Sequence, residues 1–314
     1  MRTPPLPIGQ LIHTAETEIA RVLGVCAGPP RLGEVDTVAQ VVVNAPPDIA
    51  AAWRPLLAAH GCSFNVTSVF CHASPQVSFA HPDAPVELAD LLLVMDYHYG
   101  GTHARQAALV QAKLDHGSSV TIRGGKPAAQ LHLMRKWPSF TFVPRAYDRR
   151  SRDFQSELAP SADACGRYGC IDLVGVPPFW GQLAPAGPVP FRTAHGISLG
   201  RFLAELADGA PSAGAPAVWY AGAPPASAPD WSFTVAELLD VTAMLAHRAM
   251  ARAGSAGGVR GVDAMTLRAP VPAGAFFLAH APGDDGFPPR ISGPFEGDGE
   301  GLGISFIHGV IERG

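Results

Sequence analysis

The sequence has no long apolar run. No segment approaches the roughly 18 consecutive apolar residues that a membrane-spanning helix needs. The N-terminal residues, MRTPPLPIGQ, contain no apolar stretch after their single arginine, whereas a secretory signal peptide has one. We therefore expect a cytoplasmic protein with no membrane partner.

Cysteine is also scarce, with five residues in a chain of 314. An odd number in a chain of this length does not indicate a disulfide scaffold. A four-ligand zinc site stays open as an alternative to ordinary buried thiols, although the spacing differs from the C-x2-C of common structural sites. The residues that could form it are Cys62, Cys71 or His72, Cys165 and Cys170.

Charged residues make up only 16% of the chain, whereas hydrophobic residues make up 47%. A substantial core is therefore possible, and wholesale disorder is excluded. The formal net charge of −4 argues against a general nucleic-acid-binding protein. Residues 121–152, however, hold eight basic residues and one acid, a net charge of +7. This segment is either an electrostatic footprint for phosphate or a set of internal ion pairs and solvated side chains.

Hydrophobic periodicity predicts an amphipathic helix over residues 8–23 and another over 47–60, with Pro46 and Pro47 marking the start of the second. Residues 37–44 are typical of a strand, with a buried helix as the alternative. Further strands are predicted over 63–70, 76–79, 88–97, 107–114 and 139–143, and further helices over 126–137, 197–207 and 234–252.

The strands 88–97 and 107–114 form a predicted hairpin, because Gly100 and Gly101 lie in the short connection between them. The first of these strands contains a continuous apolar run, Leu91–Val94, instead of an alternating pattern. Such a run is typical of a strand covered on both faces. We therefore expect a central sheet with helices on both sides.

Polar side chains stand at the ends of these two hairpin strands. Gln111 and Lys113 are two residues apart and therefore share one face of their strand, and antiparallel pairing brings Asp90 beside them. Mg²⁺ prefers hard oxygen ligands. Candidate ligands are the Asp90 carboxylate, the Gln111 amide oxygen and the Ala112 carbonyl oxygen, while Lys113 would stabilise charge that builds on a phosphate.

This arrangement resembles the PD-(D/E)xK nuclease superfamily, whose restriction-endonuclease-like fold has a mixed central sheet flanked by helices. The resemblance covers about residues 8–145. It places Asp90 on the first acid of the sheet and Gln111, Ala112 and Lys113 on the (D/E)xK triplet. The chain departs from the motif at Ala89, where the family has proline, and at Gln111, which is neutral.

The resemblance also implies an auxiliary acid on the first helix, for which Glu16 and Glu18 are candidates. Glu87 is a further candidate, but strict alternation puts it on the opposite face from Asp90 unless a bulge turns it. Gln130 falls where some RecB-like members carry a glutamine on the nucleic-acid side. The residues expected to hold backbone phosphate are Arg145, Arg149, Arg150 and Arg152.

We interpret the chain as an α/β protein. Residues 1–150 would form a restriction-endonuclease-like core, and residues 151–314 a mostly helical, loop-rich extension that packs on the core or forms a second small domain. The expected activity is hydrolysis of phosphodiester bonds with Mg²⁺ or Mn²⁺, in DNA in preference to RNA, and bacterial defence fits by analogy alone.

Two alternatives stay open. One is a catalytically inactive subunit of the same fold that binds nucleic acid or a protein partner. The other is a structural protein, in which the polar residues at the strand ends are unrelated to chemistry and the Pro-rich residues 175–230 form a surface for a partner. A homodimer or a regulatory partner subunit is compatible with each of the nuclease-fold interpretations.

Overall fold

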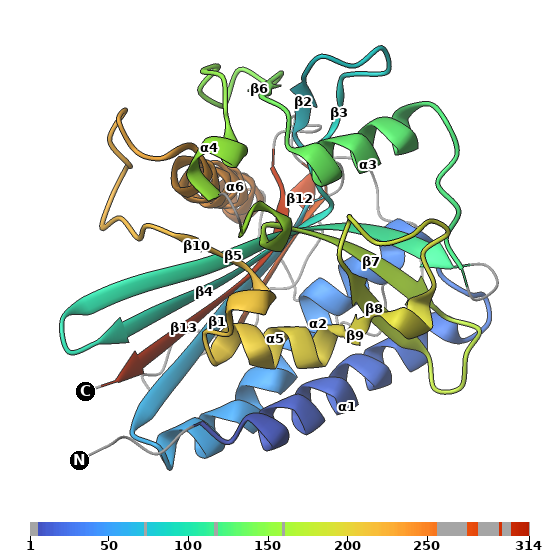
Figure 1. The fold of residues 1–314 in the computed structure, drawn as a ribbon. Coiled ribbons are helices and arrows are strands. Elements are labelled where there is room, and N and C mark those ends of the chain that lie inside the picture. The colour runs from blue at the N-terminus through green and yellow to red at the C-terminus, as the bar shows by residue number, and fades with distance from the viewer. Residues whose placement is uncertain are drawn as a thin grey trace.

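The chain folds around one large mixed β-sheet to which both halves of the sequence contribute (Figure 1). The computed structural model describes residues 6–71, 74–115, 119–158, 161–255, 275–281, 295–296 and 303–313. The strands of the large sheet are β1 (Cys62–Cys71), β4 (Leu91–Tyr99), β5 (Thr102–Asp115), β7 (Gly166–Asp172), β8 (Phe179–Leu183), β9 (Ile197–Ser198), β10 (Ala215–Ala217), β11 (Ala275–Ala281), β12 (Phe295–Glu296) and β13 (Ser305–Arg313). Their order is β12-β11-β1-β13-β4-β5-β7-β8-β9, and β10 pairs with β5. The expected mixed α/β architecture is confirmed.

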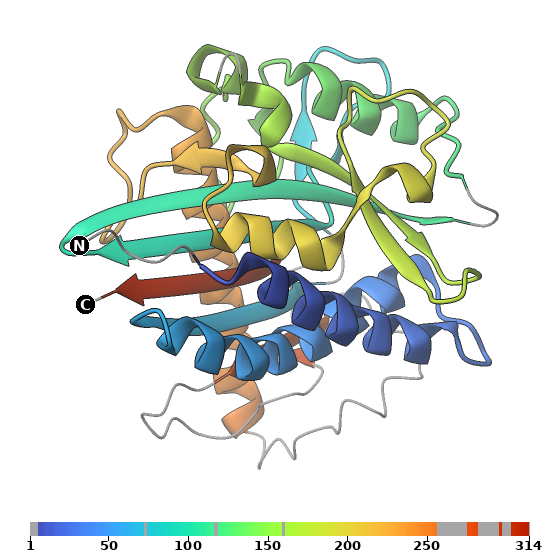
Figure 2. The ribbon, with the colours of Figure 1, turned by 60° about the horizontal axis from the view of Figure 1, so that its bottom comes forward.

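Helices cover both faces of this sheet (Figures 1 and 2). One face packs against α1 (Ile8–Ala27), α2 (Glu34–Ala58) and α5 (Leu199–Ala207). The other packs against α3 (Lys126–Lys136), α4 (Phe154–Leu158), α6 (Asp230–Ser255) and a small sheet of β2 (Gln76–Ser78), β3 (Val86–Glu87) and β6 (Thr141–Phe142). Short 3-10 turns occur at Ser161–Ala164, Thr193–His195 and Pro211–Ala213.

The predicted hairpin is confirmed as the antiparallel pair β4–β5, which runs in register from Leu91 opposite Val110 to Tyr99 opposite Thr102. Gly100 and Gly101 form its turn with φ angles of 52° and 81°, a region that glycine adopts without strain. Leu91 and Leu93 belong to the core beneath α2, whereas Leu92 belongs to the core on the opposite face. The strand is therefore covered on both faces, as its continuous apolar run predicts.

Helix α2 differs from the sequence prediction. Residues 37–44 are helical and not extended, and Pro46 and Pro47 lie inside the helix instead of at its start. Each proline removes a hydrogen-bond donor from the helix. The apolar stripe nevertheless continues through them, since Val38, Val42 and Ile49 are all buried against the sheet, and tertiary packing overrides local propensity.

The second half of the chain does not only pack on a core formed by the first half, because it contributes strands to the large sheet. Strand β7 pairs in parallel with β5, and β13 lies between β1 and β4. The described strands of residues 151–314 therefore belong to the same sheet as β1, β4 and β5. Several of these strands are short and lie between glycine- and proline-rich segments. Their sequences therefore show little alternation of apolar and polar residues and resemble loops.

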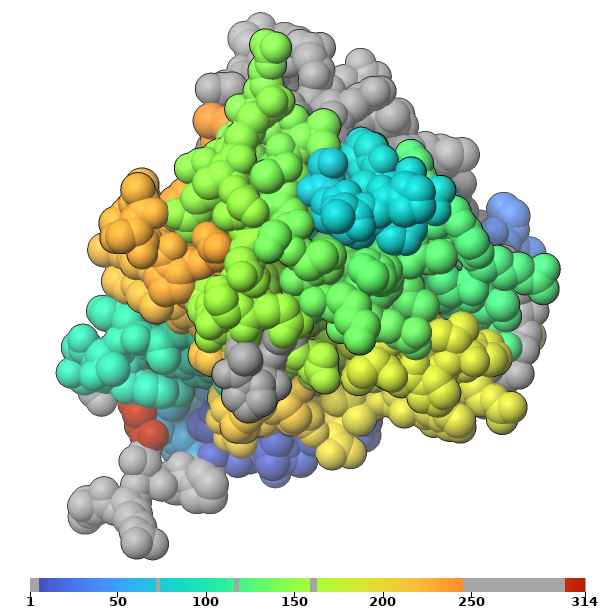
Figure 3. Space-filling model, turned by 45° about the horizontal axis from the view of Figure 1, so that its top comes forward, coloured from blue at the N-terminus to red at the C-terminus, as the bar shows by residue number. Residues whose placement is uncertain are grey.

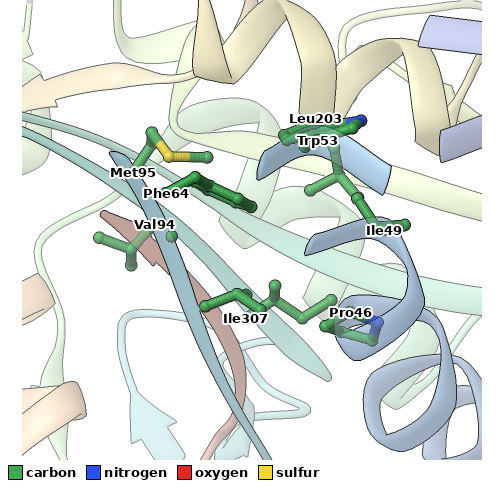
Figure 4. A pocket seen from close by; sticks show the side chains of 10 residues that line it. Pro46, Ile49, Trp53, Phe64, Val94, Met95, Leu203 and Ile307 are labelled. Carbon is green, nitrogen blue, oxygen red and sulfur yellow. The ribbon is translucent and has the colours of Figure 1, made fainter. Parts of the chain in front are cut away.

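An apolar cavity lies between α2 and the sheet (Figure 4). Pro46, Ile49 and Trp53 from α2 face Phe64 and Met95 from the strands, and every lining residue is apolar or glycine. It offers no polar group for chemistry.

No helix among the described residues is long and apolar enough to cross a membrane.

Candidate active site

The structure brings Asp90 and Gln111 into contact at one end of the large sheet. Asp90 immediately precedes β4, and its backbone N–H donates to Val110 O at 3.0 Å, which fixes it beside the end of β5. Its Oδ2 accepts from the Ala112 backbone N–H at 2.7 Å and from Gln111 Nε2. Ala112 thus contributes its N–H to this contact, whereas the sequence predicted a role for its carbonyl oxygen.

Lys113 joins this group through an acid that sequence reasoning missed. Its Nζ lies 2.8 Å from Glu34 Oε1, and Glu34 Oε2 accepts from the Leu114 N–H at 2.9 Å. Glu34 is the first residue of α2, after Gly33 at the N-cap, and a carboxylate is favoured at a helix N-terminus. The sequence contains a signal for this acid, the motif G-E-x-D before a valine-rich run. The signal was missed because the helix was predicted to start near residue 47.

Asp90 has an unusual electrostatic environment. Burial raises its pKa to about 7; the positive charge of Lys113 opposes this, and the negative charges of Glu34 and Glu87 add to it. Burial also acts to lower the pKa of Lys113, but the charges of Asp90 and Glu34 outweigh it, so the net shift is upward. A carboxyl group that titrates near neutrality beside a charged lysine is typical of functional sites.

The side-chain oxygen atoms at this corner are of the type that a hard divalent cation prefers. Among the described residues, no group of three or more His, Cys, Asp or Glu side chains is arranged to hold a metal ion. A cation here would use the carboxylates of Asp90 and Glu34 together with Gln111 Oε1, which is buried and has no hydrogen-bond partner within the described part of the chain. Carboxylate and amide oxygens suit Mg²⁺ or Mn²⁺ and not a softer ion.

Glu87 and Gln130 lie next to this group. Glu87 belongs to β3 and not to β4, so the expected alternation with Asp90 does not apply, and its charge reaches Asp90 without a bulge. Gln130 Nε2 on α3 contacts the Glu87 carbonyl at 3.5 Å. Gln130 is 8% exposed, so it lies inside the fold and not on an open nucleic-acid surface.

Glu16 is not brought to this corner. Its Oε1 accepts from Ser198 Oγ at the N-terminus of α5, and Asp90 has no resolved interaction with it. Glu18 pairs with Arg21 at 2.8 Å on the exposed side of α1. The helix acid that lies beside Lys113 is therefore Glu34 on the second helix, and the structure does not bring Glu16 or Glu18 of the first helix to this corner.

The basic segment divides into buried and exposed side chains. Arg152 is fully buried, pairs with Glu237 at 2.8 Å, and has a pKa that burial lowers. Arg150 donates to Ala226 O at 2.6 Å and pairs with Asp230 at 3.1 Å. These two arginines hold α6 against the core, so Arg152 is out of reach of a phosphate and Arg150 is half-buried and engaged within the fold. Arg145 and Arg149 are exposed.

A serine motif was also overlooked in the sequence. Residues 196–200, GISLG, match the G-x-S-x-G spacing of serine hydrolases, and Ser198 is the last residue of β9 and the N-cap of α5. Its φ of −62° is ordinary, and its hydroxyl caps the helix by accepting from the Arg201 N–H. Both glycines are explained by close packing, since a Cβ at Gly200 would lie 2.5 Å from Glu16 N. Ser198 is therefore a helix cap.

None of the five cysteines forms a disulfide, and all five are buried. Burial raises the pKa of the Cys71 and Cys165 thiols well above the ordinary value, which disfavours the thiolate form that binds zinc. His72, the remaining member of the zinc alternative, lies outside the described residues. The described cysteines are thus core side chains.

Comparison with known proteins finds no matching family model, no matching curated protein and no matching solved structure.

Proposed function

We propose that the protein is a metal-dependent nuclease that hydrolyses phosphodiester bonds, with DNA as the favoured substrate. The observation that carries this proposal is the convergence of one lysine with two carboxylates at a sheet end. Asp90 contacts Gln111 and Ala112, and Lys113 contacts Glu34. Carboxylates that can hold a divalent cation and a lysine that can stabilise charge on a phosphate suit phosphodiester cleavage, and Gln111 and Lys113 have the spacing of the Q-x-K triplet.

Each side chain has a role that follows from its surroundings. Asp90, Glu34 and Gln111 would hold Mg²⁺ or Mn²⁺, which when bound supplies a Lewis acid for the phosphate and a means of activating water. The Ala112 N–H and Gln111 Nε2 keep the Asp90 carboxylate in one orientation. The ammonium group of Lys113 would stabilise the negative charge that develops on the phosphate.

The surface beside α3 offers a place for the polymer. The chain from α3 to α4, in green, and the adjoining β2–β3 segment, in cyan, lie side by side on the face shown in Figure 3. In the basic segment, exposed cationic side chains remain after Arg150 and Arg152 are assigned to the core; they are Arg123, Lys126, Lys136, Arg145 and Arg149. Contacts from such residues to phosphate bind nucleic acid without reading its sequence, and they weaken steeply with salt.

A second function is favoured by the neutral side chain of Gln111. The triplet carries one negative charge fewer than the family motif, and Lys113 is held by Glu34. A catalytically inactive subunit on the same fold would bind nucleic acid without a divalent cation. Its binding would also survive the loss of Lys113.

The proposal is tested by incubating the protein with supercoiled plasmid, linear duplex, single-stranded DNA and RNA, each with Mg²⁺, Mn²⁺ or EDTA. We expect cleavage of at least one DNA substrate that depends on the metal and is lost in Asp90→Ala. The Glu18→Gln variant, which alters a half-buried acid of α1 that pairs with Arg21, is a matched control and should cut like the native chain. Equal cleavage by native protein and Asp90→Ala would refute the proposed site.

A further inference from the structure

Tyr168 carries a buried hydroxyl without a hydrogen-bond partner in the described part of the chain. The residue lies on β7 and is 0% exposed. Its ring stacks on Phe191, with centroids 4.7 Å apart and an interplanar angle of 26°. Packing therefore fixes the ring, whereas the hydroxyl is unused. Buried polar groups are nearly always hydrogen-bonded, so this exception needs an explanation.

The position of Tyr168 in the sheet offers an explanation for its buried hydroxyl. In the parallel pair β5–β7, Tyr168 is the register partner of Gln111, and paired residues project from the same face of a sheet. Gln111 Oε1 is itself buried and without a partner among the described residues. Two unused polar groups thus stand on neighbouring strands, next to the Asp90 carboxylate that Gln111 Nε2 contacts.

A second observation places the hydroxyl near Asp90. Burial is the main reason that the pKa of Tyr168 lies above its ordinary value, and the negative charge of Asp90 is the next cause. The phenol is therefore within electrostatic reach of the carboxylate. A hydroxyl can donate a hydrogen bond to water and accept one from it. Because the Tyr168 hydroxyl is uncharged, it is no substitute for a carboxylate ligand.

We propose that Tyr168 is a positioning residue of the Asp90 site, whose hydroxyl hydrogen-bonds a water molecule carried by the divalent cation that Asp90 and Gln111 hold. This inference rests on the proposed function. Mg²⁺ gives up its hydration reluctantly and keeps several waters when bound to protein. Groups that hydrogen-bond such waters orient the site and strengthen the binding of the ion.

The inference is tested by titrating Mn²⁺ into the metal-free protein and following the free ion by electron paramagnetic resonance. We expect Tyr168→Phe to weaken Mn²⁺ binding about tenfold. In EDTA the same variant should melt no earlier than the native chain, because it removes a hydroxyl that makes no contact within the protein.

Tyr97→Phe is the matched control. Tyr97 is a buried tyrosine of β4 whose hydroxyl contacts Leu206 O and, at 3.1 Å, Gln106 Oε1. Its removal should lower the melting temperature in EDTA and leave Mn²⁺ affinity unchanged. The control therefore separates loss of a protein hydrogen bond from loss of a contact with the ion's water.

The outcomes distinguish the inference from the proposed function. If native protein binds Mn²⁺, Asp90→Ala does not, and Tyr168→Phe binds as well as native protein, the role of Tyr168 is refuted while the site stands. A melting temperature of Tyr168→Phe lowered as far as that of Tyr97→Phe refutes it too. If native protein and Asp90→Ala bind Mn²⁺ equally, or neither binds, both proposals fail.

Discussion

Lys113 Nζ lies 2.8 Å from Glu34 Oε1, so the lysine of the Q-x-K triplet is paired with the first residue of α2. This contact joins a strand end to the N-terminus of a helix that is 79 residues distant in sequence. With Asp90 beside them, two carboxylates share one ammonium group. The charge at the corner is therefore negative when Asp90 is ionised, which favours a cation.

The first prediction concerns Glu34. Glu34→Gln should lower the rate of metal-dependent cleavage by about ten- to a hundredfold, because it removes a carboxylate beside Lys113. Single-turnover rates with saturating Mg²⁺ measure the effect. Glu16→Gln, at the contact with Ser198, should change little. If Glu16→Gln lowers the cleavage rate and Glu34→Gln does not, the helix acid of the site is Glu16 and not Glu34.

The second prediction concerns stability and pH in the absence of metal. The pKa of Asp90 is about 7 in the folded chain and 3.8 for a free carboxyl group. Between these values the folded chain keeps a proton that the unfolded chain has lost. The contribution of Asp90 to the free energy of unfolding is therefore complete below about pH 4 and declines as the pH rises through about 7.

Asp90→Asn tests this sign. The amide oxygen can still accept from the Ala112 N–H, but the side chain does not titrate. Relative to native protein in EDTA, the melting temperature of the variant should rise by about 2–4 °C or more between pH 4 and pH 8, the shift that corresponds to roughly 1 kcal/mol. A difference that stays constant over this range would show that Asp90 does not titrate near neutrality.

The third prediction concerns protons released by metal binding. Since a carboxylate must be ionised to bind a cation, Mg²⁺ binding below the pKa of Asp90 displaces a proton. Calorimetry in two buffers of different ionisation enthalpy should show about one proton released at pH 6 and markedly less at pH 8. Release of the same number of protons at both pH values would show that the bound ion does not contact Asp90.

The fourth prediction separates the arginines of the basic segment. The double variant Arg145→Ala/Arg149→Ala should weaken DNA binding and reduce the dependence of log K on log salt by about two units, roughly one for each phosphate contact. Arg152→Ala should instead lower the free energy of unfolding by about 3 kcal/mol, because Glu237 would stay buried without its partner. Unchanged salt dependence in the double variant would exclude these two residues from the DNA surface.

The sequence allowed the hairpin and its polar ends to be predicted because they rest on local rules. Strand alternation places Gln111 and Lys113 together, glycines with positive φ mark the turn, and antiparallel pairing delivers Asp90 to Ala112. The apolar run from Leu91 to Val94 likewise indicates a strand with two covered faces. These features depend on contacts that are near in sequence.

The features that could not be predicted depend on contacts between distant segments. Pro46 and Pro47 suggested a helix start, but burial of α2 on the sheet carries the helix back to Glu34 and so places that acid at Lys113. Strand β13 enters the sheet between β1 and β4 from the far end of the chain. The net charge of residues 121–152 also could not predict that Arg152 is buried against Glu237.

The most direct test of the central claim is DNA cleavage by Lys113→Ala, measured together with DNA binding and with melting in EDTA. Our account predicts that this variant loses Mg²⁺-dependent cleavage by at least about a hundredfold, while it still binds DNA and remains folded. Cleavage at the native rate would contradict the proposed site. An absence of cleavage by the native chain, with DNA binding that needs no metal and is unchanged in the variant, would show an inactive binding subunit.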